Sequence, residues 1–115
     1  MAVARLGKEL EEAAPRPILD MFVTTGARQG ASVHEAFATA SRRHFAQSIG
    51  AARRDCQELL YWLRLLEACD NSAHDDGLYE MFLKEAQAVL ELLTGVYRTA
   101  RQELQAPGGG GDAGP

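Results

Sequence analysis

The chain has 115 residues and a net charge of −4 at pH 7, so its length fits one domain and its charge excludes a uniformly basic nucleic-acid-binding protein. Hydrophobic residues make up 46% of it, yet no apolar run approaches the roughly 20 residues of a membrane span, and no secretory signal is evident at the N-terminus. Two cysteines without a CxxC pair make a disulfide scaffold unexpected. We therefore expect a cytoplasmic protein that is not bound to membranes.

The first predicted element is a short helix at residues 3–14. Leu6 and Leu10 are four residues apart, and acidic residues cover the remaining surface. Pro15 and Pro17 are expected to end it, because proline lacks the donor N–H and disfavours helix in the residue before it.

A second helix is predicted at about residues 18–40. Its middle is poor in large apolar residues, and Gly26 and Gly30 lie there. Small side chains allow close approach between helices, so we expect tight packing against a neighbouring helix, with a kink as the alternative.

The strongest signal is an apolar seam with alternating steps of four and three residues in the third predicted helix, residues 42–69. Ser41 precedes this helix as its expected N-cap. The seam contains Phe45, Ile49, Ala52, Cys56, Leu59, Leu63 and Leu66.

A turn rich in Asp, Asn and Gly leads to the fourth predicted helix, residues 77–104. Its seam contains Phe82, Ala86, Val89, Leu93, Val96 and Ala100. A second stripe, Leu83, Leu90 and Tyr97, makes the apolar face wider than one seam requires. Such a face predicts burial both in the chain's own core and against another subunit.

These elements predict an all-α fold, an antiparallel up-down helical bundle with three long helices and a short N-terminal one. The domain covers residues 1–106. Residues 107–115 are rich in glycine, have no side chains to bury, and are expected to be a disordered tail.

Three stretches resemble the four helix bundle protein family, small bacterial proteins first noted as encoded in intervening sequences of 23S ribosomal RNA genes. The stretches are TTGARQGASVHEAFATAS, FAQSIGAARRDCQELLYWLRLLEACD and FLKEAQAVLELLTGVYRTAR. Two features depart from the family pattern: few residues precede the prolines, and Arg28, Gln29 and Ser32 stand where the family tends to have Ser, Ile and Asn.

The resemblance implies an all-helical bundle that assembles with itself, as family members known as ring-like pentamers do. A related branch serves as the accessory protein of diversity-generating retroelements, where it binds the reverse transcriptase and RNA. No activity is established for most of the family.

The third predicted helix contains five arginines. Arg42, Arg53 and Arg64 are eleven residues apart, close to three full turns, and Arg43 and Arg54 form a parallel pair. One interpretation is a surface that follows nucleic-acid phosphates. The other is a solvated flank with ion pairs, which the negative net charge and the lack of exposed aromatic residues between the arginines favour.

The aromatic and histidine residues give weaker signals. Tyr61 and Trp62 could stack on bases, but their spacing beside leucines favours packing in the core or at an interface. His34, His44 and His74 lie in three different elements without an HExxH motif, so no metal site is expected.

No catalytic constellation is evident. Cys56 lies in the apolar seam and is expected to be a buried structural thiol. Glu35 and Glu58 could pair as general acid and base only if a cleft held them. Neither a nucleophile elbow nor a phosphate-binding glycine loop is present, so the sequence predicts no enzyme and no cofactor.

Two hypotheses remain. The first is a non-enzymatic, self-associating bundle that acts as a scaffold or interaction module. The second is an RNA- or DNA-binding accessory protein, a partner of a reverse transcriptase, that uses the arginines of the third helix.

Overall fold

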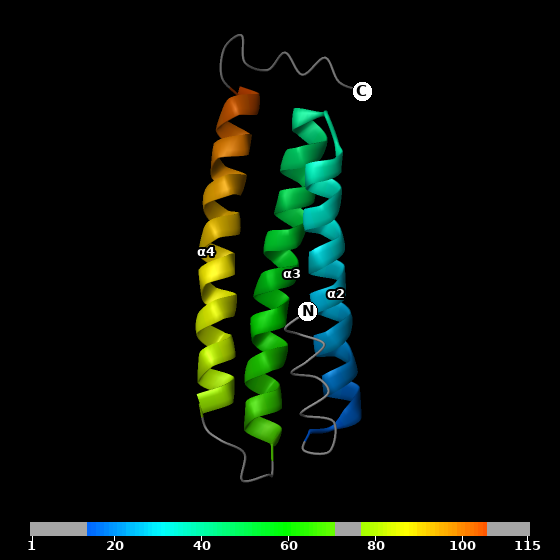
Figure 1. Ribbon diagram of the computed structural model, residues 1–115, viewed down its shortest axis with the longest axis vertical. Coiled ribbons are helices and arrows are strands. Elements are labelled where there is room, and N and C mark those ends of the chain that lie inside the picture. Colours follow the sequence, from blue (N-terminus) through cyan, green and yellow to red (C-terminus); the bar gives the residue numbers. More distant parts are fainter. Residues whose placement is uncertain (1–13, 71–76, 106–115) are drawn as a thin grey trace.

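The computed structural model describes residues 14–70 and 77–105, which form three helices that lie side by side (Figure 1). They are α2, Arg16–Ala38; α3, Arg42–Cys69; and α4, Gly77–Gln105. Successive helices run in opposite directions, with α3 between the other two, so the predicted all-α antiparallel architecture is confirmed. The helix predicted at residues 3–14, apart from Ala14, and the glycine-rich tail lie outside the described residues.

Helix α2 begins two residues earlier than expected and includes Pro17 in its first turn. Proline is tolerated there because the first N–H groups of a helix have no acceptor within it. The backbone N–H of Leu19 donates to the Pro15 carbonyl over 3.0 Å, which closes that turn. Pro17 therefore lies within the first turn of α2, whereas the end of the helix predicted before it lies outside the described residues.

The turn between α2 and α3 is fixed by two hydroxyl groups. Thr39 is extended, and its Oγ1 accepts the N–H of Ser41 over 3.2 Å, so α2 ends at Ala38 and not at Ala40. Ser41 Oγ then accepts the N–H of His44 over 3.2 Å, which confirms the predicted N-cap.

The core follows the seam of α3 and has two clusters. In the first, Phe22 of α2 and Phe82 of α4 meet edge to face, with ring centroids 5.7 Å apart. This cluster contains Leu19, Phe22, Leu59, Leu63, Leu66, Tyr79 and Phe82. The second contains Ala36, Ile49, Ala52, Cys56 and Leu93, with Phe45 and Val96 partly buried against it.

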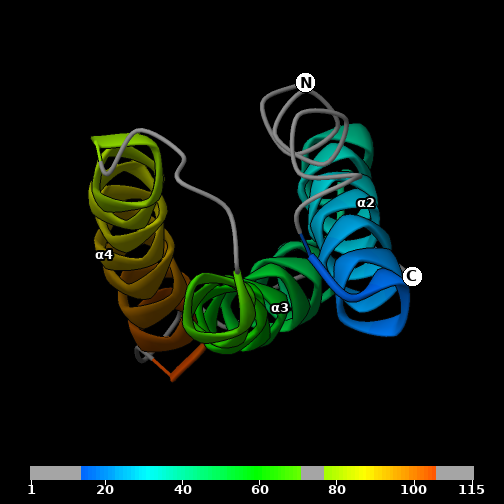
Figure 2. The ribbon, with the colours of Figure 1, turned by 90° about the horizontal axis from the view of Figure 1, so that it is seen from below.

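One long side of the described bundle is open. Helix α3 packs along both α2 and α4, whereas the backbones of α2 and α4 do not approach each other and these helices meet through side chains such as Phe22 and Phe82. The end-on view shows them flanking α3 (Figure 2). Val89, expected in the core seam of α4, is 39% exposed, because no described helix covers the side of α4 on which it lies.

No helix within residues 14–70 and 77–105 is both long enough and apolar enough to cross a membrane.

Leu63→Ala should destabilise the fold by about 2–5 kcal/mol, because it leaves a cavity where a fully buried side chain packs between the helices. Urea unfolding at low protein concentration measures the change. The matched control is Met81→Ala, which shortens a side chain of similar size at a residue that is 54% exposed and should change stability by less than about 0.5 kcal/mol. Equal effects of the two variants would contradict the assigned core.

Candidate functional site

The described residues contain no metal-ligand cluster. No three His, Cys, Asp or Glu side chains gather within residues 14–70 and 77–105. His34 is exposed, His44 Nε2 lies 2.9 Å from Glu35 Oε1, and His74 is outside the described residues. Glu58 is fourteen residues from His44 along α3, about 21 Å, so Glu35 and Glu58 do not form an acid–base pair.

Cys56 lies fully buried in the core, where its thiol donates to the carbonyl of Ala86 over 3.4 Å. Burial raises the pKa of this thiol, because the thiolate loses its hydration. The thiol form therefore dominates at neutral pH, which fits a structural role and disfavours a nucleophilic one.

A polar cluster joins α2 to α3 around the carboxylate of Glu58. Thr25 Oγ1 and Trp62 Nε1 each donate to Glu58 Oε2 over 2.9 Å. Arg28 Nη2 lies 3.1 and 3.2 Å from the two oxygens of Glu58, and Arg28 Nε donates to Asp55 over 3.1 Å. The hydrogen bonds from Trp62 and Thr25, followed by Arg28, lower the pKa of Glu58. A carboxylate supplied with this many donors is a weak base, and through Thr25 and Arg28 it links α2 to α3.

The five arginines predicted as a nucleic-acid site on α3 do not all share one surface. Arg54 and Arg64 are exposed, and neither has a carboxylate partner among the described residues. Arg42 and Arg43 are exposed at the N-terminal end of α3. Arg53 is half-buried and turns toward α4, because α4 packs along that flank of α3.

Tyr61 is 58% exposed, so this ring does not pack in the core of the chain, and packing at an interface, the other predicted placement, stays a prediction. It meets the half-buried Trp62 edge to face, with ring centroids 4.9 Å apart. Tyr61 lies seven residues after Arg54 and three before Arg64, spacings that place all three on one side of α3. An exposed aromatic ring therefore does stand between arginines on this helix.

The sequence analysis did not single out Arg98 and Arg101 on α4. Arg101 Nη1 donates to the hydroxyl of Tyr97 over 3.0 Å, and Arg53 lies over the face of the same ring. The four-residue spacing of Tyr97 and Arg101 indicates a pair on one helix face. That Arg53 joins them depends on how α3 packs against α4, which no local pattern reveals.

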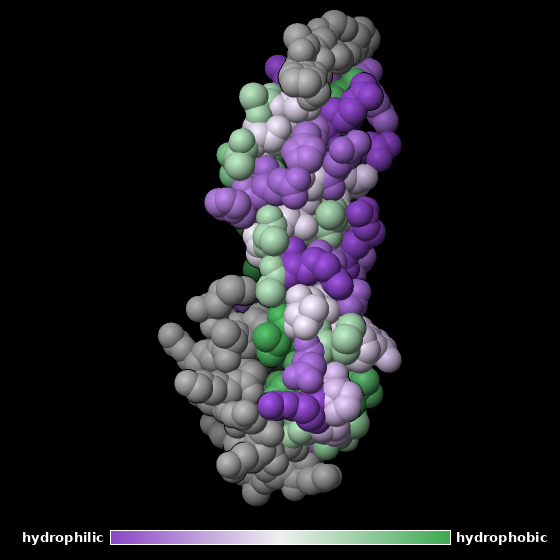
Figure 3. Space-filling view, turned by 90° about the vertical axis from the view of Figure 1, so that its right-hand side faces the viewer, coloured by the Kyte–Doolittle hydropathy of each residue, from purple (hydrophilic) through white to green (hydrophobic). Residues whose placement is uncertain are grey.

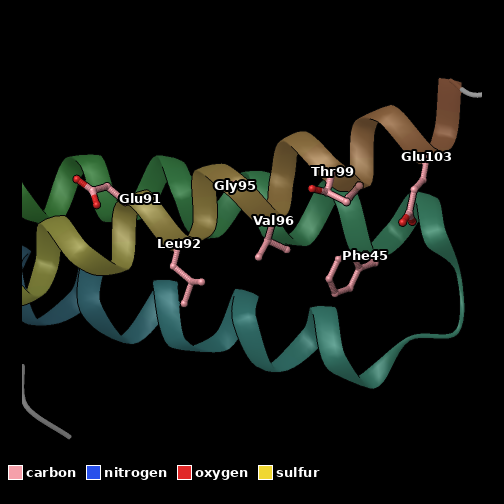
Figure 4. Close-up of a pocket in the computed structure, with 8 residues that line it drawn as sticks. Phe45, Glu91, Leu92, Gly95, Val96, Thr99 and Glu103 are labelled. Atoms are coloured by element: carbon pink, nitrogen blue, oxygen red, sulfur yellow. The ribbon is translucent and has the colours of Figure 1, made fainter.

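An open groove of about 550 Å³ follows the C-terminal half of α4. Phe45, Leu92 and Val96 project from α3 and α4 toward the side where α2 lies (Figure 4). Glu91, Thr99 and Glu103 supply polar lining, and a Cβ at Gly95 would meet no atom within 4 Å. The groove is thus an apolar strip with acidic residues on α4 beside it.

On α2, Phe37 continues this apolar strip. Its side chain is 74% exposed, although its ring meets that of Phe45 edge to face with centroids 5.7 Å apart. Away from the groove, the side of α2 is mainly hydrophilic in its upper half (Figure 3). Phe37 and Leu92, the most exposed large apolar residues described on α2 and α4, therefore lie on the side of the molecule that carries the groove.

Glu58→Gln should make the stability of the fold depend less on pH under acidic conditions. Because folding lowers the pKa of Glu58, its contribution is present above the unfolded pKa of about 4.5 and is lost as pH falls through the lower folded value. Melting temperatures measured across this acid range should rise with pH more steeply in the wild type than in the variant. Glu103→Gln, which removes an exposed carboxylate elsewhere, is the control; identical slopes for Glu58→Gln and the wild type would contradict the assignment.

Comparison with known proteins supports the architecture. Neither a protein-family model nor a curated protein matches the chain. The chain is similar to the crystal structure of a protein with unknown function from the S23 ribosomal protein family of Bacteroides thetaiotaomicron, with a TM-score of 0.72 and 22% identity over 84% of this chain and 85% of that one. This is the family, under another name, that the sequence resembles. The chain therefore has the fold of an S23 ribosomal protein family member, in agreement with the resemblance in its sequence.

Proposed function

We propose that the chain is a non-enzymatic member of this family that associates with itself and acts as a scaffold or interaction module. The observation that carries the proposal is the apolar strip on the open side, where Phe37 is 74% and Leu92 is 65% exposed. Exposed apolar surface of this kind, bordered by polar residues, marks interaction sites in soluble proteins. Burial of one such side chain stabilises a complex by about 1.5–3 kcal/mol.

The occupant we propose for the groove is a second copy of the chain. Phe37 of α2 and Leu92 of α4 are 74% and 65% exposed, and no described helix covers either of them. The segment at residues 107–115 offers no large apolar side chain. A second copy of the chain would cover these exposed apolar residues with apolar residues of its own.

The resemblance supports a particular assembly. Family members known as ring-like pentamers lead us to propose a pentamer here as well. Helix α4 contributes to this arrangement by packing one flank on α3 and leaving Val89 and Leu92 on its open side.

Leu92→Glu should weaken self-association by about tenfold or more, because it places a charge where an apolar side chain would be buried. Sedimentation velocity at several micromolar concentrations measures the oligomer distribution. Gln87→Glu adds the same charge at an exposed position of α4 that does not line the groove, and should leave the distribution unchanged. A wild-type chain that sediments only as a monomer would rule out the proposal.

A second candidate function is the binding of RNA or DNA, as an accessory protein of a reverse transcriptase. The observation that favours it is the exposed Tyr61 between Arg54 and Arg64. Aromatic rings stack on bases while arginines contact phosphates, and this combination is typical of surfaces that bind single strands. The expected lack of an exposed aromatic residue, which disfavoured this function at first, is therefore wrong.

If α3 binds a single strand, Arg54→Glu with Arg64→Glu should reduce affinity and lower the dependence of log K on log salt by about 1–2 units. Tyr61→Ala should lose about 1–3 kcal/mol with little change in salt dependence. Fluorescence anisotropy with a labelled RNA oligonucleotide measures both. Arg16→Glu with Lys84→Glu makes the same charge change at residues paired with Asp20 and Glu80. An equal loss in that control would show that only net charge matters.

A further inference from the structure

A second cleft, of about 390 Å³, opens between α3 and the C-terminal half of α4 and shares no lining residue with the apolar groove. Arg53 enters it from α3, and Arg98 and Arg101 enter it from α4. Thr94 and Tyr97 line it as well, with two glutamines near the end of α4. No acidic residue is among its described lining residues.

Tyr97 holds two of the three guanidinium groups in place. The guanidinium carbons of Arg53 and Arg101 lie 5.9 and 5.7 Å from the centre of its ring. Arg101 also donates to the Tyr97 hydroxyl over 3.0 Å, and Arg53 Nε donates to Thr94 Oγ1 over 3.1 Å. These contacts leave other N–H groups of both guanidiniums available, because each arginine carries five N–H donors.

The position of Tyr97 depends on Gly50 of α3. A Cβ at residue 50 would lie 2.8 Å from Tyr97 Cε1, closer than unbonded carbon atoms approach. The absence of a side chain at this buried position lets the ring lie against α3. The two arginines are thus oriented by a ring that is fixed by the packing of α3 and α4.

Charge distinguishes this cleft from the other arginine site of the bundle. Arg28, between α2 and α3, faces two carboxylates, those of Asp55 and Glu58, at 3.1 Å each. Arg53, Arg98 and Arg101 have no ion pair among the described residues. Three positive charges around one cleft, without a carboxylate, produce a local positive potential in a chain whose net charge is −4.

We propose that the α3–α4 cleft binds a phosphate group. A phosphate offers several charged oxygens to several guanidinium forks, and charge-assisted hydrogen bonds of this kind are among the strongest that side chains form. Inorganic phosphate, a mononucleotide and the terminal phosphate of an oligonucleotide share this chemistry. The site lies apart from the groove assigned to self-association and does not rest on it.

Isothermal titration calorimetry of the full chain with adenosine monophosphate tests the proposal, with adenosine, inorganic phosphate and 5′-phosphorylated and unphosphorylated oligonucleotides as further probes. Arg98→Gln with Arg101→Gln should weaken binding of adenosine monophosphate about tenfold or more. Arg16→Gln with Lys84→Gln removes the same charge from exposed residues that line neither arginine surface and should leave it nearly unchanged. The probe that binds most tightly identifies the source of the phosphate.

Tyr97→Phe provides a second variant in case the double substitution disturbs the fold. It keeps the ring against Gly50 and removes only the hydroxyl that orients Arg101, so binding should weaken several-fold while helicity and melting temperature stay close to wild type. Binding of adenosine as tight as that of adenosine monophosphate would overturn the proposal. So would an equal loss in the Arg16 and Lys84 control, or no binding of any phosphate-bearing probe at millimolar concentration and low salt.

Discussion

The burial of α3 on two flanks at once is the constraint on which the rest of the bundle depends. Leu63 and Leu66 are fully buried between α2 and α4 in one cluster, and Ala52 and Cys56 occupy the same position in the other. Because the backbone of each outer helix approaches that of α3 and not that of the other outer helix, the positions of α2 and α4 are both set by the α3 seam. A defect in that seam would therefore loosen both neighbours.

The two interfaces of α3 differ in whether the charge of their arginine is balanced by carboxylates. On the α2 side, Arg28 is neutralised by carboxylates, and the buried Thr25 hydroxyl is satisfied by the same cluster. On the α4 side, Arg53 contacts the Thr94 hydroxyl and the Tyr97 ring, and no described carboxylate pairs with it. Neutralised charge between helices contributes to register, whereas charge without a counterion attracts an anion. This contrast separates a structural arginine from the arginines for which we propose a ligand.

The two proposed interactions use different sides of α4. Leu92 and Val96 line the apolar groove, whereas Tyr97, Arg98 and Arg101 line the basic cleft, and the two sets do not overlap. Occupation of the groove therefore does not use the residues that line the cleft. A ring in which the cleft stays exposed would present it once per copy, which raises the effective concentration of sites for a ligand with more than one phosphate.

The sequence by itself determined where the helices lie and which of their faces are apolar, because seam periodicity and helix caps depend on residues close together in the chain. The seam of α3, its bounds and its Ser41 cap are examples. Its errors concern positions where a neighbouring helix is decisive. Val89 and Tyr61 fit an apolar pattern, yet both are exposed, because periodicity shows which residues share a face but not whether another helix covers that face. Likewise, the gathering of Arg53, Arg98 and Arg101 around Tyr97 depends on the contact of two antiparallel helices at Gly50. Only the tertiary structure decides such contacts, since they join residues more than forty positions apart in the chain.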